Sequence, residues 1–193
     1  MIPALWLIAG PNGAGKTTYA RRYLASVAGT VSFVNLDEIG RGLEPLRPTP
    51  DAETARAARR VALGRLHTAI AARRSVAVET TLAGRTHRRT IALARRHGMR
   101  VELVFCMLPE VETCLARIAA RVAAGGHAVP EADVRRRFTR ASAHFPDYAA
   151  LADHWVVLDT ALAEPRLVAH GPPACIADAA LAATLPLRWP PAA

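Results

Sequence analysis

The sequence predicts an α/β fold: a mostly parallel sheet of about five strands with helices on both faces, a three-layer sandwich. The first observation is alternation, because short apolar runs that suit buried strands are followed by longer stretches of helical periodicity. This is the order of βαβ units in a parallel sheet. The second observation is the glycine-rich stretch GPNGAGKTT at 10–18, between the first apolar run and the first helical stretch. That context is typical of a phosphate-binding loop.

The individual elements follow from these patterns. Strands are expected at 4–9, 31–36, 75–80, 100–108 and 154–159, with a shorter one at 166–170. Helices are expected at 16–27, 51–73, 85–97, 109–123 and 131–143, with a weaker one at 174–184. The segment LEPLRPTP at 43–50 predicts a loop, because its prolines suit neither a helix interior nor a central strand.

Length and composition set the class of protein. A chain of 193 residues with 51% hydrophobic and 21% charged residues predicts one folded domain, 1–193. No apolar run approaches the ~20 residues of a membrane span, and the N-terminus lacks the basic region of a signal peptide. Cys106, Cys114 and Cys175 are odd in number and lack metal-ligand spacing. We therefore expect reduced, packed thiols, a cytoplasmic location and no membrane partner.

The net charge of +9 raises nucleic acid as a partner. However, the basic residues are spread through alanine-rich helical stretches such as ARAARRVALGRLHTAIAARR. A compositional bias toward arginine and alanine gives the same charge, so nucleic acid binding is the weaker expectation.

The glycine-rich stretch carries the most specific motif, because 10–17 reads G-x-x-x-x-G-K-T, the P-loop pattern. Its glycines permit a backbone whose N–H groups turn inward around a phosphate at the start of a helix. Lys16, the only lysine of the chain, is expected to bridge the β- and γ-phosphates of ATP. The Thr17 hydroxyl is expected to complete a Mg²⁺ site. The predicted cofactor-binding residues of the loop are Gly10, Pro11, Asn12, Gly13, Ala14, Gly15, Lys16, Thr17 and Thr18.

Acidic and hydroxyl side chains follow two further strands. Asp37 and Glu38 come after the strand at 31–36, and Glu79, Thr80 and Thr81 end and follow the strand at 75–80. Ligands bind at the carboxyl ends of strands in an open α/β sheet, so these side chains are expected near the P-loop. Asp37 is predicted to accept the proton of an attacking hydroxyl, with a turn-capping role as the alternative. The other four are predicted to bind the acceptor or, for Glu79 in a strand order 2-3-1-4-5, to lie near the Mg²⁺ waters.

Two arginine-bearing helices joined by Gly125 and Gly126 predict a lid at about 117–141. In the first helix, apolar side chains at 111, 115, 118 and 122 form a seam that leaves Arg117 and Arg121 on another face. In the second helix, the seam of Val134, Phe138 and Ala141 exposes Arg136, Arg137 and Arg140. We expect Arg117 to bind the nucleotide, and Arg121, Arg136 and Arg137 to stabilise the transferred phosphoryl group. The alternative is a solvated surface with helical ion pairs.

Taken together, GPNGAGKTT, FVNLDEIGRGL, VAVETTLAG, RIAARVAAGGHAVPEADVRRRF and HWVVLDT resemble the zeta-toxin-like P-loop kinases, in particular their short single-domain chromosomal branch. The resemblance covers roughly residues 5–170. It implies an ATP-dependent kinase with its base at Asp37, a Glu-Thr acceptor element at Glu79 and Thr80/Thr81, and lid arginines at Arg121 and one or more of Arg135–Arg137. The best-understood members phosphorylate a sugar hydroxyl of UDP-N-acetylglucosamine, and an antitoxin protein is a partner in keeping with this resemblance. This chain departs from the larger toxins by having ETT where they have a Glu-Gly-Thr-like run.

The expected function is therefore a Mg²⁺-dependent transfer of the ATP γ-phosphate to a hydroxyl of a small molecule, with a nucleotide sugar among the candidate acceptors. Two alternatives stay open at this point. One is a nucleotide-binding ATPase or switch without small-molecule kinase activity, and the other is a P-loop protein directed at nucleic acid.

Overall fold

The computed structural model describes residues 2–28, 31–35, 39 and 52–190. These form one seven-stranded sheet in the order β2-β3-β1-β4-β5-β6-β7. The strands are β1 (Ala4–Ala9), β2 (Ser32–Val34), β3 (Val76–Thr80), β4 (Arg100–Met107), β5 (His154–Asp159), β6 (Arg166–Gly171) and β7 (Cys175–Ile176). The helices are α1 (Lys16–Ala28), α3 (Ala52–Ala71), α4 (Thr86–Arg96), α5 (Val111–Ala123), α6 (Glu131–Ala149) and α7 (Ala179–Thr184).

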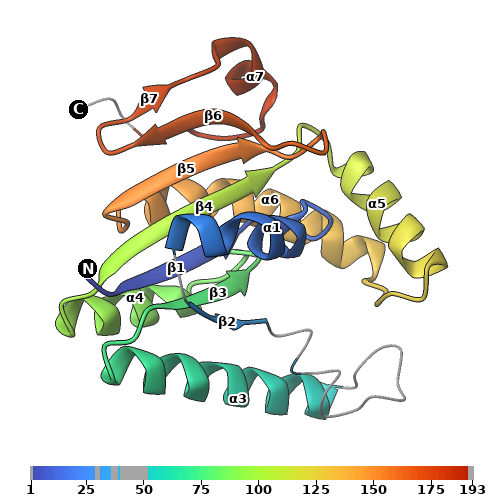
Figure 1. Ribbon diagram of the computed structural model, residues 1–193. Helices are drawn as coiled ribbons and strands as arrows, with labels where there is room; N and C mark the ends of the chain where they lie inside the picture. The colour runs from blue at the N-terminus through green and yellow to red at the C-terminus, as the bar shows by residue number, and fades with distance from the viewer. Residues whose placement is uncertain (1, 29–30, 36–38, 40–51, 191–193) are drawn as a thin grey trace.

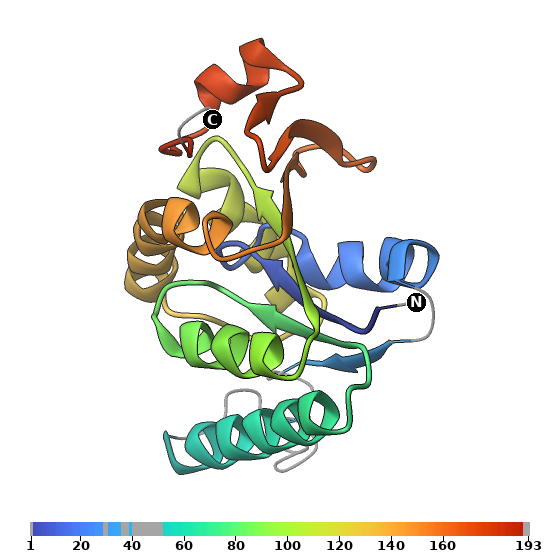
Figure 2. The ribbon, with the colours of Figure 1, turned by 90° about the vertical axis from the view of Figure 1, so that its left-hand side faces the viewer.

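The predicted strand order is confirmed, because β2, β3, β1, β4 and β5 lie side by side and pair in parallel. Side chains of successive residues point to opposite faces of the sheet. In β4, Leu103 and Phe105 belong to the core beneath α4 and α6, whereas Val104 and Cys106 belong to the core beneath α1. Figure 2 shows α1 on one side of the sheet and α4 and α6 on the other, which is the expected three-layer arrangement.

The far edge of the sheet adds detail that the prediction did not specify. The strand predicted at 166–170 exists as β6, but it runs antiparallel to β5, and the short β7 was not predicted. The six residues between β5 and β6 are too few for the crossover that a parallel pair requires, so the chain folds back as a hairpin.

The arginine-bearing helices also differ in detail. The predicted seam of α5 is wrong at its end, because Val122 is 39% exposed whereas Ile118 is buried. Figure 1 shows why: the last turns of α5 project beyond the sheet. Helix α6 extends six residues past its predicted end at 143 and contains Pro146. Phe145 and Tyr148 continue the buried stripe, so packing outweighs the hydrogen bond that proline removes.

The cysteines are all free, as expected, but they are not all packed. Cys106 and Cys114 are buried, while Cys175 is exposed on β7. Burial raises the pKa of the Cys106 thiol to about 12 and that of Cys114 to about 11, so both are protonated at neutral pH. Within the described ranges, no helix combines the length and apolar character needed to cross a bilayer.

The parallel strands all end at the same edge of the sheet, which Figure 1 shows facing α5. In the register of β1 and β3, Ile8 lies opposite Glu79 and Ala9 lies opposite Thr80. The loop that follows β1 therefore starts beside the end of β3. This edge brings the P-loop and the predicted acceptor residues together.

Candidate functional site

The backbone of the P-loop requires glycine at two positions where other elements approach closely. Gly10 has φ +136°, and a Cβ there would lie 2.0 Å from the Cys106 carbonyl oxygen of β4. Gly13 has φ +82°, and a Cβ there would lie 2.6 Å from the Cys114 carbonyl oxygen of α5. The loop thus fits tightly between β4 and the start of α5, and both glycines are needed for conformation as well as for space.

Lys16 lies inside this loop and is only 6% exposed. Its Nζ donates a hydrogen bond to the Pro11 carbonyl oxygen at 2.8 Å, and it lies 3.8 Å from Glu79 Oε1. The ammonium group therefore sits at the centre of the loop, where the P-loop pattern places the lysine that contacts phosphates.

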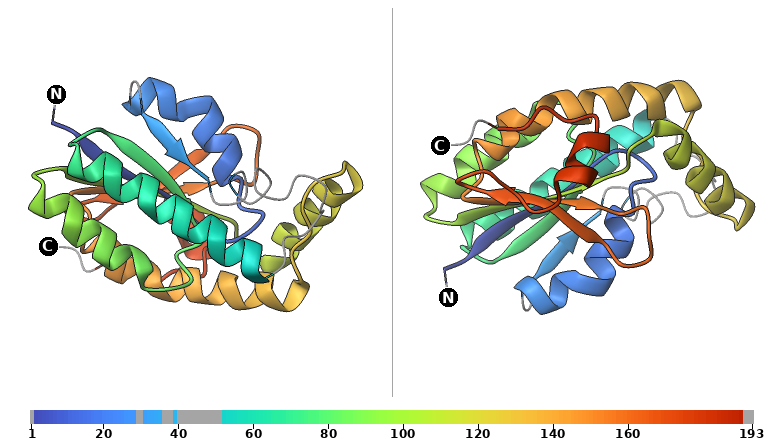
Figure 3. Two further views of the ribbon diagram at one scale, coloured as in Figure 1. Left: turned by 90° about the horizontal axis from the view of Figure 1, so that it is seen from below. Right: turned by 90° about the horizontal axis from the view of Figure 1, so that it is seen from above.

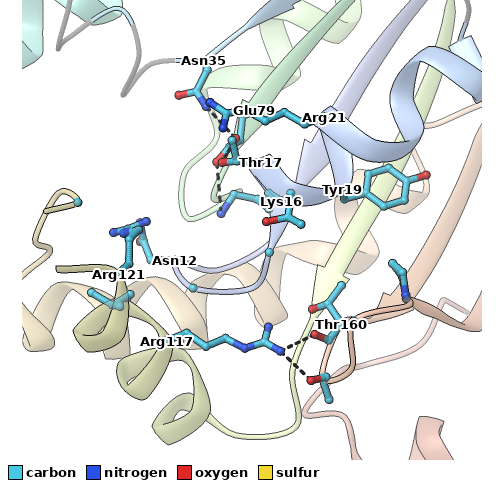
Figure 4. Close-up of a pocket in the computed structure, with 18 of the residues that line it drawn as sticks. Asn12, Lys16, Thr17, Tyr19, Arg21, Asn35, Glu79, Arg117, Arg121 and Thr160 are labelled. Atoms are coloured by element: carbon cyan, nitrogen blue, oxygen red, sulfur yellow. Dashed lines mark hydrogen bonds and ion pairs between the residues drawn. The ribbon is translucent and has the colours of Figure 1, made fainter. Parts of the chain in front are cut away.

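Glu79 links three elements at the end of β3. Its Oε2 accepts a hydrogen bond from the Thr17 hydroxyl at 2.7 Å and another from Asn35 Nδ2 at 3.0 Å. Figure 4 shows Lys16, Thr17, Asn35 and Glu79 gathered at one point above the loop. A hydroxyl and a carboxylate at hydrogen-bond distance are the oxygen ligands that suit Mg²⁺, which usually takes one or two protein ligands together with phosphates and waters. The residues present therefore fit a P-loop Mg²⁺ site.

The structure describes two of the four remaining predicted acceptor residues. Thr80 and Thr81 line a cavity beside Glu79, and the Thr80 hydroxyl accepts a hydrogen bond from the Leu82 amide. Asp37 and Glu38 lie outside the described residues. Asn35, which the sequence analysis did not single out, is buried and contacts Glu79. Its signal was present in the sequence, as a polar residue at the end of an apolar run.

Two cavities meet at the P-loop. The first, which we call the α5 pocket, has a volume of about 620 Å³ and lies between the loop, α5 and the β5–β6 turn at 160–165. Its lining includes residues 12, 13, 15–19 and 160–163, together with Arg117, Arg121 and His127. Burial raises the pKa of Tyr19 in its wall to about 12, so this phenol is neutral at neutral pH.

Arg117 bridges α5 to the β5–β6 turn. Its Nη2 donates to the carbonyl oxygens of Thr160 at 2.7 Å and Ala161 at 2.8 Å, as Figure 4 shows. The Thr160 hydroxyl in turn donates to the Ala14 carbonyl oxygen of the P-loop at 2.9 Å. Asp159, only 1% exposed, accepts from the Ala161 amide and from Arg166, so the turn is fixed at its base.

The second cavity, which we call the α6 pocket, has a volume of about 440 Å³ and lies between the P-loop, β3, α3, the start of α4 and α6. Apolar side chains of α3, β2 and β3 form one wall, and arginines of α6 form another. The two pockets share Asn12, Lys16, Asn35 and Glu79 in their linings.

The predicted lid arginines face different partners. Arg137 is the one in contact with the P-loop, because its Nη1 donates to Asn12 Oδ1 at 3.2 Å. Arg136 lines the α6 pocket and pairs with Asp133 at 2.8 Å. Arg121 lines the α5 pocket, where its Nη2 donates to the His127 carbonyl oxygen at 2.7 Å. Arg135 is turned away from both pockets, toward Glu112 and Glu131.

Comparison with known proteins gives one family and several related folds. A sequence profile described as AAA domain (AAA_33) matches residues 5–145. An uncharacterized protein of Haemophilus influenzae is 33% identical over 130 residues, which is 67% of this chain and 88% of that protein.

Three solved structures show the fold. The AvrRxo1-ORF1:-ORF2 complex with ATP has a TM-score of 0.71 at 24% identity, and the match covers 97% of this chain but only 65% of that one. The PezAT chromosomal toxin–antitoxin system of Streptococcus pneumoniae has a TM-score of 0.66 at 16% identity, covering 97% of this chain and 80% of that one. A putative kinase of Chloroflexus aurantiacus has a TM-score of 0.57 at 20% identity, covering 72% and 80%.

The P-loop geometry and the parallel sheet agree with these matches. The chain therefore belongs to the AAA domain family and has a P-loop kinase-like fold.

Proposed function

We propose that the protein is an ATP- and Mg²⁺-dependent kinase that transfers the γ-phosphate of ATP to a hydroxyl of a small molecule. The observation that carries this proposal is the pair of cavities that meet at Lys16 and Glu79. Simple hydrolysis needs one pocket for the nucleotide, whereas transfer needs a second one from which an acceptor reaches the same phosphate.

In this proposal the α5 pocket holds ATP. The loop amides at 10–17 surround the phosphates, and Lys16 neutralises the charge that builds up between the β- and γ-phosphates. Thr17 and Glu79 would hold Mg²⁺, which when bound supplies further charge neutralisation at the phosphate oxygens. Arg117 and the β5–β6 turn border the part of the pocket farther from Glu79, where the rest of the nucleotide would lie.

The α6 pocket holds the acceptor, with Thr80 and Thr81 orienting its hydroxyl groups. Arg137 is the lid arginine best placed to stabilise the transferred phosphoryl group, since it already contacts the P-loop through Asn12. Arg121 and Arg136 are proposed to approach when the lid closes. Asp37 remains our proposed base from the sequence alone, where it follows the strand expected at 31–36.

Two finer points belong to the proposal. UDP-N-acetylglucosamine is a candidate acceptor, from the sequence resemblance to zeta-toxin-like kinases. An antitoxin protein is a candidate partner, and the similarity in fold to the PezAT toxin–antitoxin system supports it. A cytoplasmic location stays an expectation from the sequence.

The Asp37→Asn variant tests the proposed chemistry. ATP affinity, measured by isothermal titration calorimetry with Mg²⁺, should stay within about threefold of wild type, because the loop is unchanged. ADP formation in the presence of an active acceptor should fall by roughly 10²–10⁴-fold, the usual contribution of a general base. Wild-type turnover by this variant would exclude Asp37 as the base.

Lys16→Ala is the matched variant for the donor site. It should weaken ATP binding and abolish turnover together, because the ammonium contacts the phosphates in both states. If ADP forms at the same rate with and without every acceptor tested, the protein is an ATPase or switch and the kinase proposal fails.

A further inference from the structure

The described lining of the α6 pocket carries more positive than negative charge, beyond what the transferred phosphate accounts for. Five cationic side chains line it, namely Lys16, Arg59, Arg136, Arg137 and Arg140, against one carboxylate, Glu79, among its described lining residues. The Glu79 carboxylate already accepts hydrogen bonds from Thr17 and Asn35 and forms an ion pair with Lys16. Arg136 and Arg137 share Asp133.

Arg59 and Arg140 are the two arginines of this pocket that remain. Within the part of the chain that the structure describes, neither forms a hydrogen bond or an ion pair. Arg59 comes from α3 and Arg140 from α6, so two helices far apart in the sequence each bring an unpaired cation to the same cavity. Figure 3 shows α3, α4 and α6 together on one face of the sheet.

The position of Arg140 along α6 follows from its neighbours. Arg137, nearly one turn earlier, contacts the P-loop at Asn12. His144, one turn later, makes a hydrogen bond of 2.8 Å between its Nδ1 and the Leu82 carbonyl oxygen. Arg140 therefore lies between the P-loop and the β3–α4 connection, on the side of the pocket away from the nucleotide.

The start of α4 opens into the same part of the pocket. Ala83, Gly84, Thr86 and His87 line the cavity, and the helix begins at Thr86 without a side-chain cap. The first amides of α4 already have acceptors, because the Arg88 amide donates to the Arg85 carbonyl oxygen at 3.1 Å and the Tyr148 phenol oxygen accepts from the amides of His87 and Arg88. The Tyr148 hydroxyl itself donates to the Gly84 carbonyl oxygen at 2.8 Å. A ligand in this part of the pocket is therefore met by side chains rather than by free helix amides.

His87 lies in the wall of the pocket and senses the charge of Arg59. Its Nδ1 is fully buried and has no hydrogen-bond partner among the described residues, although the side chain lines the pocket. Burial and the charge of Arg59 lower the pKa of His87 to about 4. The ring is therefore neutral at pH 7, with one nitrogen able to donate and the other able to accept.

We propose that Arg59 and Arg140, beside His87, form an anion subsite that binds a phosphate or carboxylate carried by the acceptor itself. This assignment rests on the proposed function, because it specifies the molecule that the α6 pocket takes as acceptor. The acceptor is a hydroxyl compound with its own anionic group. Arg59 and Arg140 bind that group, while Lys16 and Arg137 bind the transferred phosphate.

The subsite is tested first without any turnover. The ring of His87 is followed by NMR from pH 3 to 8 in the full-length protein, with inorganic phosphate and with sodium chloride of equal ionic strength. An anion bound beside the ring offsets the charge of Arg59, so phosphate should raise the pKa of His87 by about one unit or more, and chloride should not. An unchanged pKa in phosphate would overturn the subsite.

Variants separate this subsite from the P-loop, which also binds phosphate. Arg140→Gln should abolish the effect of phosphate on His87, whereas Arg65→Gln, an exposed arginine of α3 outside the pocket, should leave it intact. The effect should persist in Lys16→Ala. If it is lost in Lys16→Ala but kept in Arg140→Gln, the ion occupies the P-loop and the proposal is wrong.

Kinetics then distinguish the two sources of the anionic group. A hexose, its phosphate monoester and its aldonic acid are compared as acceptors at fixed ATP and Mg²⁺. We expect kcat/KM to be at least tenfold higher for one of the anionic compounds, and Arg59→Gln to remove that preference mainly through KM. Equal kcat/KM for neutral and anionic acceptors would contradict the proposal. If none of the three is phosphorylated, the acceptor assignment has failed for this set, while the His87 titration still decides the subsite.

Discussion

Glu79 is the residue at which most contacts of the site converge. It sits at the end of β3, opposite Ile8 in the β1 register, and is reached by Lys16, Thr17 and Asn35. Its charge matters in two ways. It balances a nearly buried ammonium group, and in the proposed function it would offer oxygens to a Mg²⁺ ion at the phosphates.

The Glu79→Gln variant separates charge from shape. The amide still accepts a hydrogen bond from Thr17 or Asn35, but it no longer offers a carboxylate to Mg²⁺ or to Lys16. We expect kcat to fall by roughly 10²-fold and the Mg²⁺ concentration for half-maximal activity to rise. Glu110→Gln, at an exposed position before α5, is the control. Wild-type Mg²⁺ dependence in Glu79→Gln would remove Glu79 from the metal site.

His87 gives a prediction for stability against pH. Its pKa of about 4 in the folded protein lies below its ordinary value of 6.5, so the unfolded chain binds the extra proton between these values. The contribution of the neutral His87 ring to the free energy of unfolding is therefore present in full above about pH 6.5, and it is lost as the pH falls toward 4.

Urea unfolding at pH 7.5 and pH 5 measures this contribution. Wild type should lose about 1–2 kcal/mol more unfolding free energy on acidification than His87→Gln does. His67→Gln, at an exposed position of α3, should behave like wild type. An identical pH dependence in wild type and His87→Gln would show that the ring is not kept neutral.

At the scale of elements, α6 determines which arginine reaches the P-loop. Arg135 and Arg137 lie on the same helix, yet Arg135 is held by Glu112 and Glu131, while Arg137 reaches Asn12. The difference follows from the helical spacing of about 100° per residue, which turns the two side chains to different sides of α6.

The pair Arg137→Met and Arg135→Met tests this assignment. Turnover should fall by about 10³-fold in Arg137→Met, the lower part of the range for an arginine on a transferred phosphoryl group. It should stay within about twofold of wild type in Arg135→Met, because an exposed ion pair contributes little. Equal losses in the two variants would mean that α6 contributes through charge in general rather than through Arg137.

The β5–β6 turn is the second element that holds the P-loop. Replacing Thr160 by Val preserves its shape but leaves the Ala14 carbonyl oxygen without its donor. We expect a loss of about 1–2 kcal/mol in unfolding free energy and a higher KM for ATP at nearly constant kcat. Thr184→Val, at the exposed end of α7, is the control. A Thr160→Val protein with wild-type stability would show that water replaces this hydrogen bond at no cost.

At the scale of the whole molecule, the local sequence predicts the P-loop and the strand order better than it predicts contacts between distant segments. The P-loop was predictable because its glycines, lysine and threonine lie within eight residues and act through backbone conformation. The parallel order of β2, β3, β1, β4 and β5 was predictable because apolar runs alternate with helices.

Contacts between distant segments could not be predicted in the same way. Arg59 carries no local pattern of its own, and its place in the α6 pocket depends on how α3 packs against β2 and β3. The exposure of Val122 has the same origin, since helical periodicity does not reveal where α5 passes beyond the sheet. The antiparallel direction of β6, by contrast, could have been inferred from the sequence, because the strands expected at 154–159 and 166–170 leave only six residues between them.

The central claim is that two pockets meeting at Lys16 and Glu79 carry a phosphoryl group from ATP to a hydroxyl. The most direct measurement is ³¹P NMR of the protein with ATP, Mg²⁺ and a panel of sugars, sugar phosphates, aldonic acids and nucleotide sugars. We predict a new phosphate-ester resonance that grows in step with ADP for one class of acceptor and is absent in Lys16→Ala. Formation of only ADP and inorganic phosphate, whatever the acceptor, would contradict the account.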